Sequence, residues 1–250
     1  MCPSTAGQRG VVPIVAIVGL LAASSAGAET PPTAPGTHPR TLETSSGFEL
    51  RYTLWIPDGY SAKKPAPLVL SLHHGFDRSR PYPEYFGRGM LLSLVVPGLE
   101  RLGAVIVAPD SHGERWSDET IEASVVELVA RVQGDYAIDP ERIAVVGFSR
   151  GGRGCWEYAA RHPGLFTAVI PIASRVDMDT AKAVEAPIFA IQSRDDGRIP
   201  IEPLQMVIGA LQRMGRNAEL LVVAGLRHHE TPLYREPLER AVPWLKDVWH

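Results

Sequence analysis

Short apolar runs alternate with longer amphipathic stretches along most of the chain. Apolar runs without internal alternation are typical of strands buried on both faces, and the stretches between them have the length and spacing of helices. The apolar runs lie at 68–72, 104–108, 143–146, 168–172, 188–191 and 220–223. The helical stretches lie at 119–132, 151–161, 201–214 and 232–248. This order predicts an α/β fold with a mostly parallel sheet and helices on both faces.

Two further stretches depart from this pattern. Residues 48–56 alternate between apolar and polar side chains, which predicts a strand at the edge of the sheet. Residues 78–97 form the longest connection of unusual composition, with Tyr82, Tyr85 and Phe86 among prolines and glycines. Because loops carry much of the recognition in such folds, this connection is a candidate wall for a binding pocket.

The first 28 residues have the pattern of a secretory signal peptide. Arg9 is the only charged residue before Glu29, residues 11–23 are almost wholly apolar, and Ala26-Gly27-Ala28 fits a cleavage site. The apolar stretch is too short for a membrane span, so we expect no stable span after cleavage. The sequence therefore predicts residues 1–28 as a signal peptide and a secreted or periplasmic protein.

The remainder divides into a linker and one domain. Residues 29–45 are rich in proline and threonine and are expected to form an extended linker, and residues 46–250 are long enough for one α/β domain. The net charge of −3 argues against a nucleic-acid partner. Of the two cysteines, Cys2 belongs to the signal segment, so Cys155 has no partner for an internal disulfide. We expect Cys155 to be a small buried side chain.

The segment Gly147-Phe148-Ser149-Arg150-Gly151 has the pattern G-x-S-x-G between an apolar run and a helical stretch. A serine on a sharp strand-to-helix turn exposes its hydroxyl, and the flanking glycines leave room for the turn. The following helix points its N-terminal N–H groups and the positive end of its dipole at any anion that forms beside the serine. Ser149 is therefore the candidate nucleophile.

A serine nucleophile needs a base, and the base needs an acid that orients it. Functional groups of an open parallel sheet gather beyond the carboxyl ends of the strands, so the residues after each strand are candidates. Asp195 and Asp196 follow one apolar run, and His228 and His229 follow the next. The order is serine, acid and base, but spacing alone does not separate the neighbouring acids or the neighbouring histidines.

Two pairs of adjacent histidines raise the question of a metal. The chain has no H-E-x-x-H motif or comparable ligand spacing, and adjacent histidines rarely bind one ion. We therefore expect no metal at His73, His74, His228 or His229.

The chain resembles the α/β-hydrolase superfamily. It is similar to secreted bacterial esterases and predicted peptidases of the polyhydroxybutyrate-depolymerase, feruloyl-esterase and prolyl-oligopeptidase-like group. Four motifs carry the resemblance. The first is the elbow with its approach Ile138-Asp139-Pro140-Glu141-Arg142-Ile143, and the second is the following helix and strand start, Trp156-Glu157-Tyr158-Ala159-Ala160-Arg161-His162-Pro163-Gly164-Leu165-Phe166. The third is Asp196-Gly197-Arg198-Ile199-Pro200, which is similar to D-x-x-V-P, and the fourth is Gly225-Leu226-Arg227-His228, which has the pattern G-x-x-H. The chain departs from the pattern at Arg150, Gln192, Ser193 and Arg227.

The resemblance implies specific roles. It places the acid at Asp196 and the base at His228, with Asp177 as the position that some relatives use for the acid. It implies an oxyanion hole made by the backbone N–H groups of Phe76 and Arg150. Large lid domains of this fold are often inserted between residues 174 and 187, where this chain has no room for one. Four residues are candidates for contact with substrate, namely His74, Tyr85, Trp116 and Arg150.

The function expected from these features is hydrolysis of carboxylic esters without a cofactor, through an acyl-enzyme on Ser149. The alternatives are a peptidase or amidase of the prolyl-oligopeptidase-like type and a non-catalytic binding scaffold with the same fold. A small-molecule or polymer-derived ester is the expected partner.

Arginines are frequent in the loops that follow the strands, at positions 78, 80, 115, 150, 175, 194, 198 and 227. The planar guanidinium suits a carboxylate or a phosphate, which raises the possibility of an anionic substrate. Aspartates and glutamates occupy the same loops, so these arginines can equally pair locally or face water. The sequence leaves both alternatives open.

Overall fold

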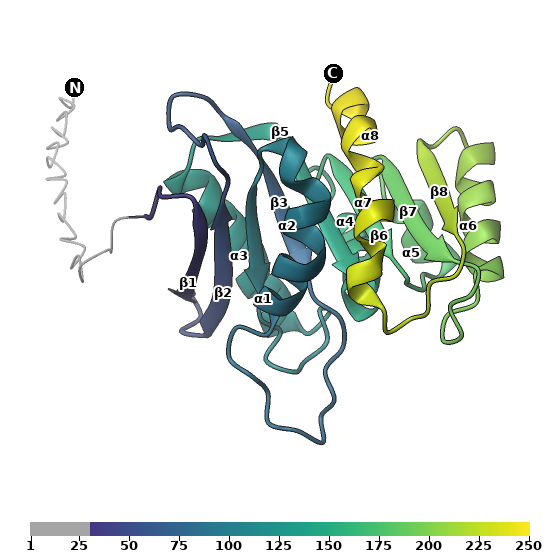
Figure 1. The fold of residues 1–250 in the computed structure, drawn as a ribbon, viewed down its shortest axis with the longest axis horizontal. Helices are drawn as coiled ribbons and strands as arrows, with labels where there is room; N and C mark the ends of the chain where they lie inside the picture. The colour runs from purple at the N-terminus through teal and green to yellow at the C-terminus, as the bar shows by residue number, and fades with distance from the viewer. Residues whose placement is uncertain (1–30) are drawn as a thin grey trace, which may run out of the picture. The chain divides into compact units, whose positions relative to one another are not determined.

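The computed structural model describes residues 31–250, which form an α/β domain around one sheet (Figure 1). The expected signal peptide, residues 1–28, lies outside the described residues. Along the sheet the strands lie in the order β1-β2-β4-β3-β5-β6-β7-β8. The strands are β1 (Gly36–Glu43), β2 (Glu49–Ile56), β3 (Ala66–Leu72), β4 (Val105–Pro109), β5 (Ile138–Phe148), β6 (Ala168–Ile172), β7 (Ile188–Ser193) and β8 (Ala218–Val223).

Helices cover both faces of the sheet (Figure 1). Segments α3, α4, α5 and α6 pack on one face, whereas α1, η1, α2, α7 and α8 pack on the other. The helical segments are α1 (Gly87–Met90), η1 (Leu91–Val95), α2 (Val96–Leu99), η2 (Glu100–Leu102), α3 (Glu119–Asp135), α4 (Arg150–Arg161), α5 (Met178–Ala183), α6 (Glu202–Arg213), η3 (Thr231–Tyr234), α7 (Arg235–Glu239) and α8 (Ala241–Val248). The predicted fold class is confirmed.

The central strands are apolar throughout because each face of the sheet has its own core. In β3, Leu68 and Leu70 pack into the cluster on the α3 and α4 face, and Val69 between them packs into the cluster on the α8 face. This alternation follows from the period of two residues in a strand. Each such side chain contributes about 1.5–3 kcal/mol by burial, which is why the strands appear in the sequence as continuous apolar runs.

Strand β1 differs from the sequence-based expectation. The stretch expected to be a linker, residues 29–45, contains β1, which pairs antiparallel with β2 from Gly36 to Glu43. The prediction that residues 48–56 form an edge strand was therefore wrong, because β2 has β1 on one side and β4 on the other. Strand β1 itself is the edge strand, a place that tolerates Pro39 in the strand interior.

Three other segments also differ from expectation or refine it. The single helix expected over 232–248 is divided into η3, α7 and α8. The short helical segments α1 to η2 span residues 87–102 and so include the second half of the connection expected over 78–97. In the part of the chain that the structure describes, the connection between β6 and β7 holds only the short α5, so no large lid is inserted there.

The parallel strands β3, β5, β6, β7 and β8 bring their carboxyl ends to one edge of the sheet. The segments that follow β3, β5, β7 and β8 therefore meet at this edge. Within residues 31–250, we find no helix with the length and apolar character needed to span a membrane.

Candidate active site

Ser149 lies on a strained turn between β5 and α4. Its backbone has φ 55° and ψ −110°, a conformation that L-residues rarely adopt, and its N–H donates to the carbonyl of Ile172 at 2.9 Å. A Cβ at Gly147 would collide with the backbone of Gly151, and a Cβ at Gly151 would collide with the carbonyl of Leu72. Glycine at both positions lets β5 turn sharply into α4, as the motif predicts.

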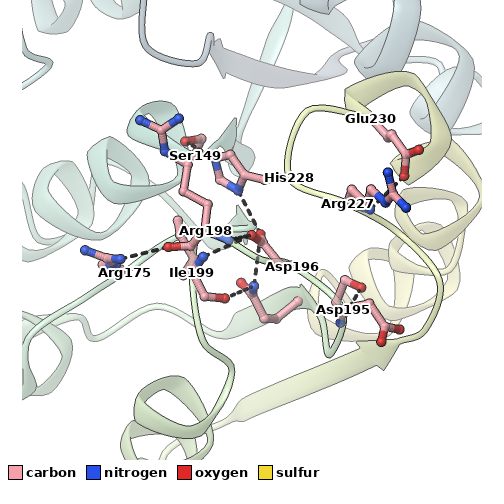
Figure 2. A network of polar contacts seen from close by, with 11 residues as sticks. Ser149, Arg175, Asp195, Asp196, Arg198, Ile199, Arg227, His228 and Glu230 are labelled. Carbon is pink, nitrogen blue, oxygen red and sulfur yellow. Dashed lines mark hydrogen bonds and ion pairs between the residues drawn. The ribbon is translucent and has the colours of Figure 1, made fainter.

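The turn directs Ser149 to His228, and His228 in turn contacts Asp196 (Figure 2). The Ser149 Oγ lies 2.8 Å from Nε2 of His228, and Nδ1 of His228 lies 2.8 Å from Oδ2 of Asp196. The histidine and the aspartate are both nearly fully buried, with 6% of each residue exposed. These three side chains thus form a hydrogen-bonded line that ends at the serine hydroxyl.

The Asp196 carboxylate accepts hydrogen bonds from four donors. Its Oδ1 accepts the backbone N–H groups of Arg198 at 2.9 Å and Ile199 at 3.0 Å, while Oδ2 accepts from His228 and, at 3.3 Å, from Nε2 of Gln192. Burial alone would raise the pKa of the Asp196 carboxyl, but the hydrogen bonds from His228, Arg198 and Ile199 lower it below its usual value. A charged carboxylate is therefore maintained beside Nδ1 of His228.

The geometry separates the neighbouring candidates that spacing left open. Asp195 points away from His228, and its Oδ2 accepts the N–H of Gly225 at 2.6 Å. Asp177 begins α5 as its N-cap and accepts the N–H of Thr180 at 2.8 Å. The structure therefore places Asp196 against His228 and uses Asp195 and Asp177 to hold loop or helix backbone.

His229 is the neighbour of His228 that residue spacing left as an alternative base. It is exposed, and its ring packs edge-on against the ring of His228 with centroids 5.5 Å apart. No hydrogen bond joins His229 to Ser149 among the described residues. The position next to Ser149 is thus filled by His228.

The segment after β3 forms the opposite wall of the site. His73, at the start of this segment, is buried, and its Nδ1 donates to the carbonyl of His74 at 2.7 Å, while its Nε2 accepts the N–H of Ser111 at 3.1 Å. Burial lowers the pKa of His73 to about 3, so the ring is neutral at physiological pH. His73 therefore fixes the backbone that leads to Phe76.

A cavity of about 530 Å³ opens above Ser149. Of the residues expected to contact substrate or the oxyanion, His74, Phe76 and Arg150 line it together with Ser149 and His228. Five further polar or aromatic residues that were not among the predicted site residues also line it: Asp77, Phe148, Arg198, His229 and Thr231. Position after a strand could have indicated all five, since each lies within three residues of a predicted site residue.

Two predicted contact residues are not part of the cavity lining. Trp116 is only 1% exposed and belongs to the core, where its Nε1–H donates to the carbonyl of His73 at 3.0 Å. Its expected place in the pocket was wrong, because this hydrogen bond turns the indole inward. Tyr85 is half-buried at φ 52° and does not line the cavity either.

Within residues 31–250, no group of three or more histidine, cysteine, aspartate or glutamate side chains is arranged to hold a metal ion. Cys155 is buried, as expected, and lies directly behind the elbow, since a Cβ at Gly147 would come within 2.9 Å of its Sγ.

Comparison with known families is consistent with this geometry. The family described as "alpha/beta hydrolase fold" matches residues 69–198, which include Ser149 and Asp196. The chain belongs to this family.

Similar proteins carry carboxymethylenebutenolidase or esterase names. A protein of Yersinia pestis named "Putative carboxymethylenebutenolidase" is 24% identical over 223 residues, which cover 78% of this chain and 79% of that protein. "Probable feruloyl esterase C" of Aspergillus flavus is 28% identical over 138 residues, which cover 50% of this chain and 46% of that protein. The crystal structure of a thermostable esterase superimposes with a TM-score of 0.69 at 21% identity, covering 84% of this chain and 62% of that one.

Proposed function

We propose that this α/β hydrolase cleaves carboxylic esters through an acyl-enzyme on Ser149. The observation that carries the proposal is the hydrogen-bonded line from Ser149 through His228 to Asp196 at the base of an open cavity. A serine alone is a poor nucleophile at neutral pH, and a histidine within hydrogen-bond distance of its hydroxyl supplies the base that it needs.

In the proposed acylation step, Ser149 attacks the ester carbonyl while Nε2 of His228 takes the hydroxyl proton. Asp196 accepts the hydrogen bond from Nδ1, which fixes the tautomer with Nε2 free and stabilises the imidazolium that forms. The imidazolium then donates its proton to the alcohol oxygen as the carbon–oxygen bond breaks. The alcohol leaves, and the acyl group stays on Ser149.

The negative charge of the tetrahedral intermediate needs donors aimed at its oxygen. We assign this role to the backbone N–H groups of Phe76, which lies in the loop after β3, and Arg150, which is the first residue of α4. The N-terminal position of Arg150 adds the positive end of the helix dipole. Donors of this kind contribute roughly 3–4 kcal/mol each to stabilisation of the transition state.

In the second half of the reaction, water takes the place of the alcohol. His228 removes a proton from the water, the hydroxide attacks the acyl carbonyl, and Ser149 leaves with the proton that His228 returns. Each step balances with ester and water alone, so the proposed reaction needs no cofactor.

The names of similar proteins favour an ester over a peptide as the substrate, since the relatives reported above are named as an esterase or a carboxymethylenebutenolidase. A peptidase must protonate a poorer leaving group and usually binds an extended chain. The peptidase and the non-catalytic scaffold are kept as outcomes of the test.

A fluorophosphonate probe tests the nucleophile directly. We expect the wild-type protein to be labelled at Ser149, the Ser149→Ala variant to be unlabelled, and the variant of the exposed Ser61, Ser61→Ala, to be labelled like wild type. Mass spectrometry of the labelled peptide identifies the site. Absence of labelling in the folded wild-type protein would support the non-catalytic scaffold.

A panel of acyl p-nitrophenyl esters, feruloyl esters and peptide amides then decides the reaction class. We expect turnover of esters to exceed turnover of amides by several orders of magnitude, and Ser149→Ala to remove it. A preference for peptide amides in kcat/KM would replace the esterase proposal with the peptidase alternative.

We also propose that the protein is exported and loses residues 1–28, on the basis of the sequence pattern. Fractionation of the producing cells and N-terminal sequencing test this proposal. The expected mature chain begins at Glu29, and recovery of an uncleaved chain in the cytoplasm would contradict it.

A further inference from the structure

The structure sorts the arginines of the loops that follow the strands into paired and unpaired ones. Arg78 donates to Glu114 at 2.8 Å, and Nε of Arg80 lies 3.5 Å from the Asp77 carboxylate. Both arginines face a carboxylate of the protein itself, Arg80 within its own loop and Arg78 in the loop after β4.

Two arginines of the cavity have no such partner. Neither Arg150 nor Arg198 forms an ion pair with a carboxylate within the described residues, although both line the cavity above Ser149. The guanidinium of Arg150 makes one long contact, in which Nη1 donates to the carbonyl of Glu114 at 3.5 Å. The N–H and the carbonyl of Arg198 are both hydrogen-bonded, but its guanidinium forms no hydrogen bond with any of residues 31–250.

The two guanidinium groups reach the cavity from separate segments. Arg150 begins α4, and its side chain lies across Gly75, where a Cβ would be only 3.1 Å from Nε of Arg150. Arg198 follows β7 and extends its side chain toward Ser149 (Figure 2). Glycine at position 75 therefore leaves the space that Arg150 occupies beside the serine.

The charge at this site is not balanced by the lining. Asp77 also lines the cavity, but its Oδ1 accepts the N–H and the hydroxyl of Ser79, and its Oδ2 faces Arg80. Burial lowers the pKa of Arg150, and the nearby Arg78 and Arg115 lower it further. An arginine nevertheless stays protonated at neutral pH, so a half-buried cation remains crowded by other cations. A bound anion would relieve this unfavourable charge.

We propose that the cavity binds esters that carry a carboxylate and that Arg150 and Arg198 bind this carboxylate. The inference rests on the proposed ester hydrolysis by Ser149 and adds its substrate class. A guanidinium donates two parallel hydrogen bonds to a carboxylate, and two guanidiniums from separate segments fix its position relative to Ser149. The carboxylate can belong to the acyl or the alcohol half of the substrate.

Two matched pairs of substrates test the proposal and distinguish the halves. The acyl-side pair is p-nitrophenyl hydrogen adipate and its neutral methyl ester. The alcohol-side pair is p-acetoxybenzoate and methyl p-acetoxybenzoate. The measured quantity is the ratio of kcat/KM for the charged member to kcat/KM for the neutral one. After correction for spontaneous hydrolysis, we expect this ratio to be about 10 or more in one of the two pairs. Added salt should lower the ratio, because it screens the charge of the carboxylate.

Variants connect the ratio to the two arginines. Arg150→Met and Arg198→Met should each lower the ratio by about tenfold or more, the effect of one charge-assisted hydrogen bond. Arg194→Met is the control, because Arg194 is an exposed arginine of the loop after β7 that does not line the cavity, and it should leave the ratio as in wild type.

The outcomes separate the two proposals. If wild-type protein hydrolyses both members of both pairs with ratios near one, and the arginine variants leave the ratios unchanged, the carboxylate proposal is overturned while ester hydrolysis stands. If no ester is cleaved and the fluorophosphonate probe does not label Ser149, the proposed function itself fails.

Discussion

The indole Nε1 of Trp116 donates a 3.0 Å hydrogen bond to the carbonyl oxygen of His73, which lies at the end of β3. Both residues are buried, and the bond ties the segment after β4 to the loop that leads to Phe76. Trp116 thus holds the backbone of the candidate oxyanion loop from the core side, and it does not line the cavity.

Replacement of Trp116 by phenylalanine should therefore weaken both the fold and the site. Trp116→Phe leaves the His73 carbonyl without this donor and reduces the packed volume, so we expect a loss of about 2–4 kcal/mol in the free energy of unfolding. Urea unfolding measures this loss, and kcat for a p-nitrophenyl ester should fall in the folded variant. Trp55→Phe is the control, since Trp55 is half-buried on β2 and makes no such bond. Equal effects of the two substitutions would argue against the role of the hydrogen bond.

The contacts of Asp196 and His228 predict which members of the adjacent pairs matter for turnover. Asp196→Asn and His228→Ala should each lower kcat/KM for an activated ester by roughly 10³-fold or more, because the residues of such a unit act together. Asp195→Asn removes the acceptor of the Gly225 N–H and His229→Ala removes an exposed ring, so each should lower kcat/KM by less than about tenfold. A greater sensitivity at Asp195 or His229 would show that the assignment of acid and base is wrong.

The close approach of α4 to β3 predicts a large effect at Gly151. In Gly151→Ala, the added Cβ would collide with the backbone carbonyl of Leu72, so we expect a loss of about 3 kcal/mol or more, or failure to fold. Gly134→Ala is the matched control, since Gly134 lies in α3 with no atom within 4 Å of the added Cβ. There we expect a gain of about 0.5–1 kcal/mol from helix propensity. Thermal unfolding of the two variants distinguishes these effects, and equal stability of both would contradict the steric explanation.

His73 makes a specific contribution to stability that depends on pH. Its pKa is lowered from 6.5 to about 3 in the folded protein, so between these values the unfolded chain binds a proton that the folded protein does not. The free energy of unfolding should therefore fall as the pH drops below 6.5, by about 1.4 kcal/mol per pH unit from this group.

A comparison of wild type with His73→Gln isolates this contribution. Glutamine keeps an acceptor for the Ser111 N–H but does not titrate, whereas the other titrating groups are common to both proteins. The stability difference between the two should shrink as the pH is lowered from 7 toward 4 in urea unfolding. A difference that does not change with pH would mean that His73 titrates normally in the folded protein.

The sequence predicted the central strands and the elbow because both follow from local rules. Continuous apolar runs identify strands that are buried on both faces, and the elbow has a short motif in which Gly147 makes room for Gly151 and Gly151 makes room for Leu72 of β3. The order of serine, acid and histidine after successive strands placed the candidate residues at one edge of the sheet, since parallel strands share that edge. Two neighbouring residues on a loop face different directions, so only the structure separated Asp196 from Asp195.

What the sequence missed depends on contacts between distant segments. Strand β1 is polar and contains Pro39, so its pattern is that of a linker until β2 pairs with it. The inward orientation of Trp116 depends on the carbonyl of His73, which is 43 residues away. Arg80 faces Asp77 in its own loop, but the partner of Arg78 is Glu114 of another loop. Because such partners are set by the fold, the unpaired state of Arg150 and Arg198 has no signature in the sequence.

The burial of Cys155 behind the elbow gives the molecule an internal reporter. A thiol reagent can reach this side chain only when α4 separates from β5, because Cys155 is fully buried between them and its high pKa, caused by burial, keeps the thiol protonated. The rate at which a reagent such as dithiobisnitrobenzoate modifies Cys155 therefore measures how often α4 and β5, the two elements that carry Ser149 between them, come apart. Ligands that bind above Ser149 can be compared by how far they slow that modification, whether or not they are turned over.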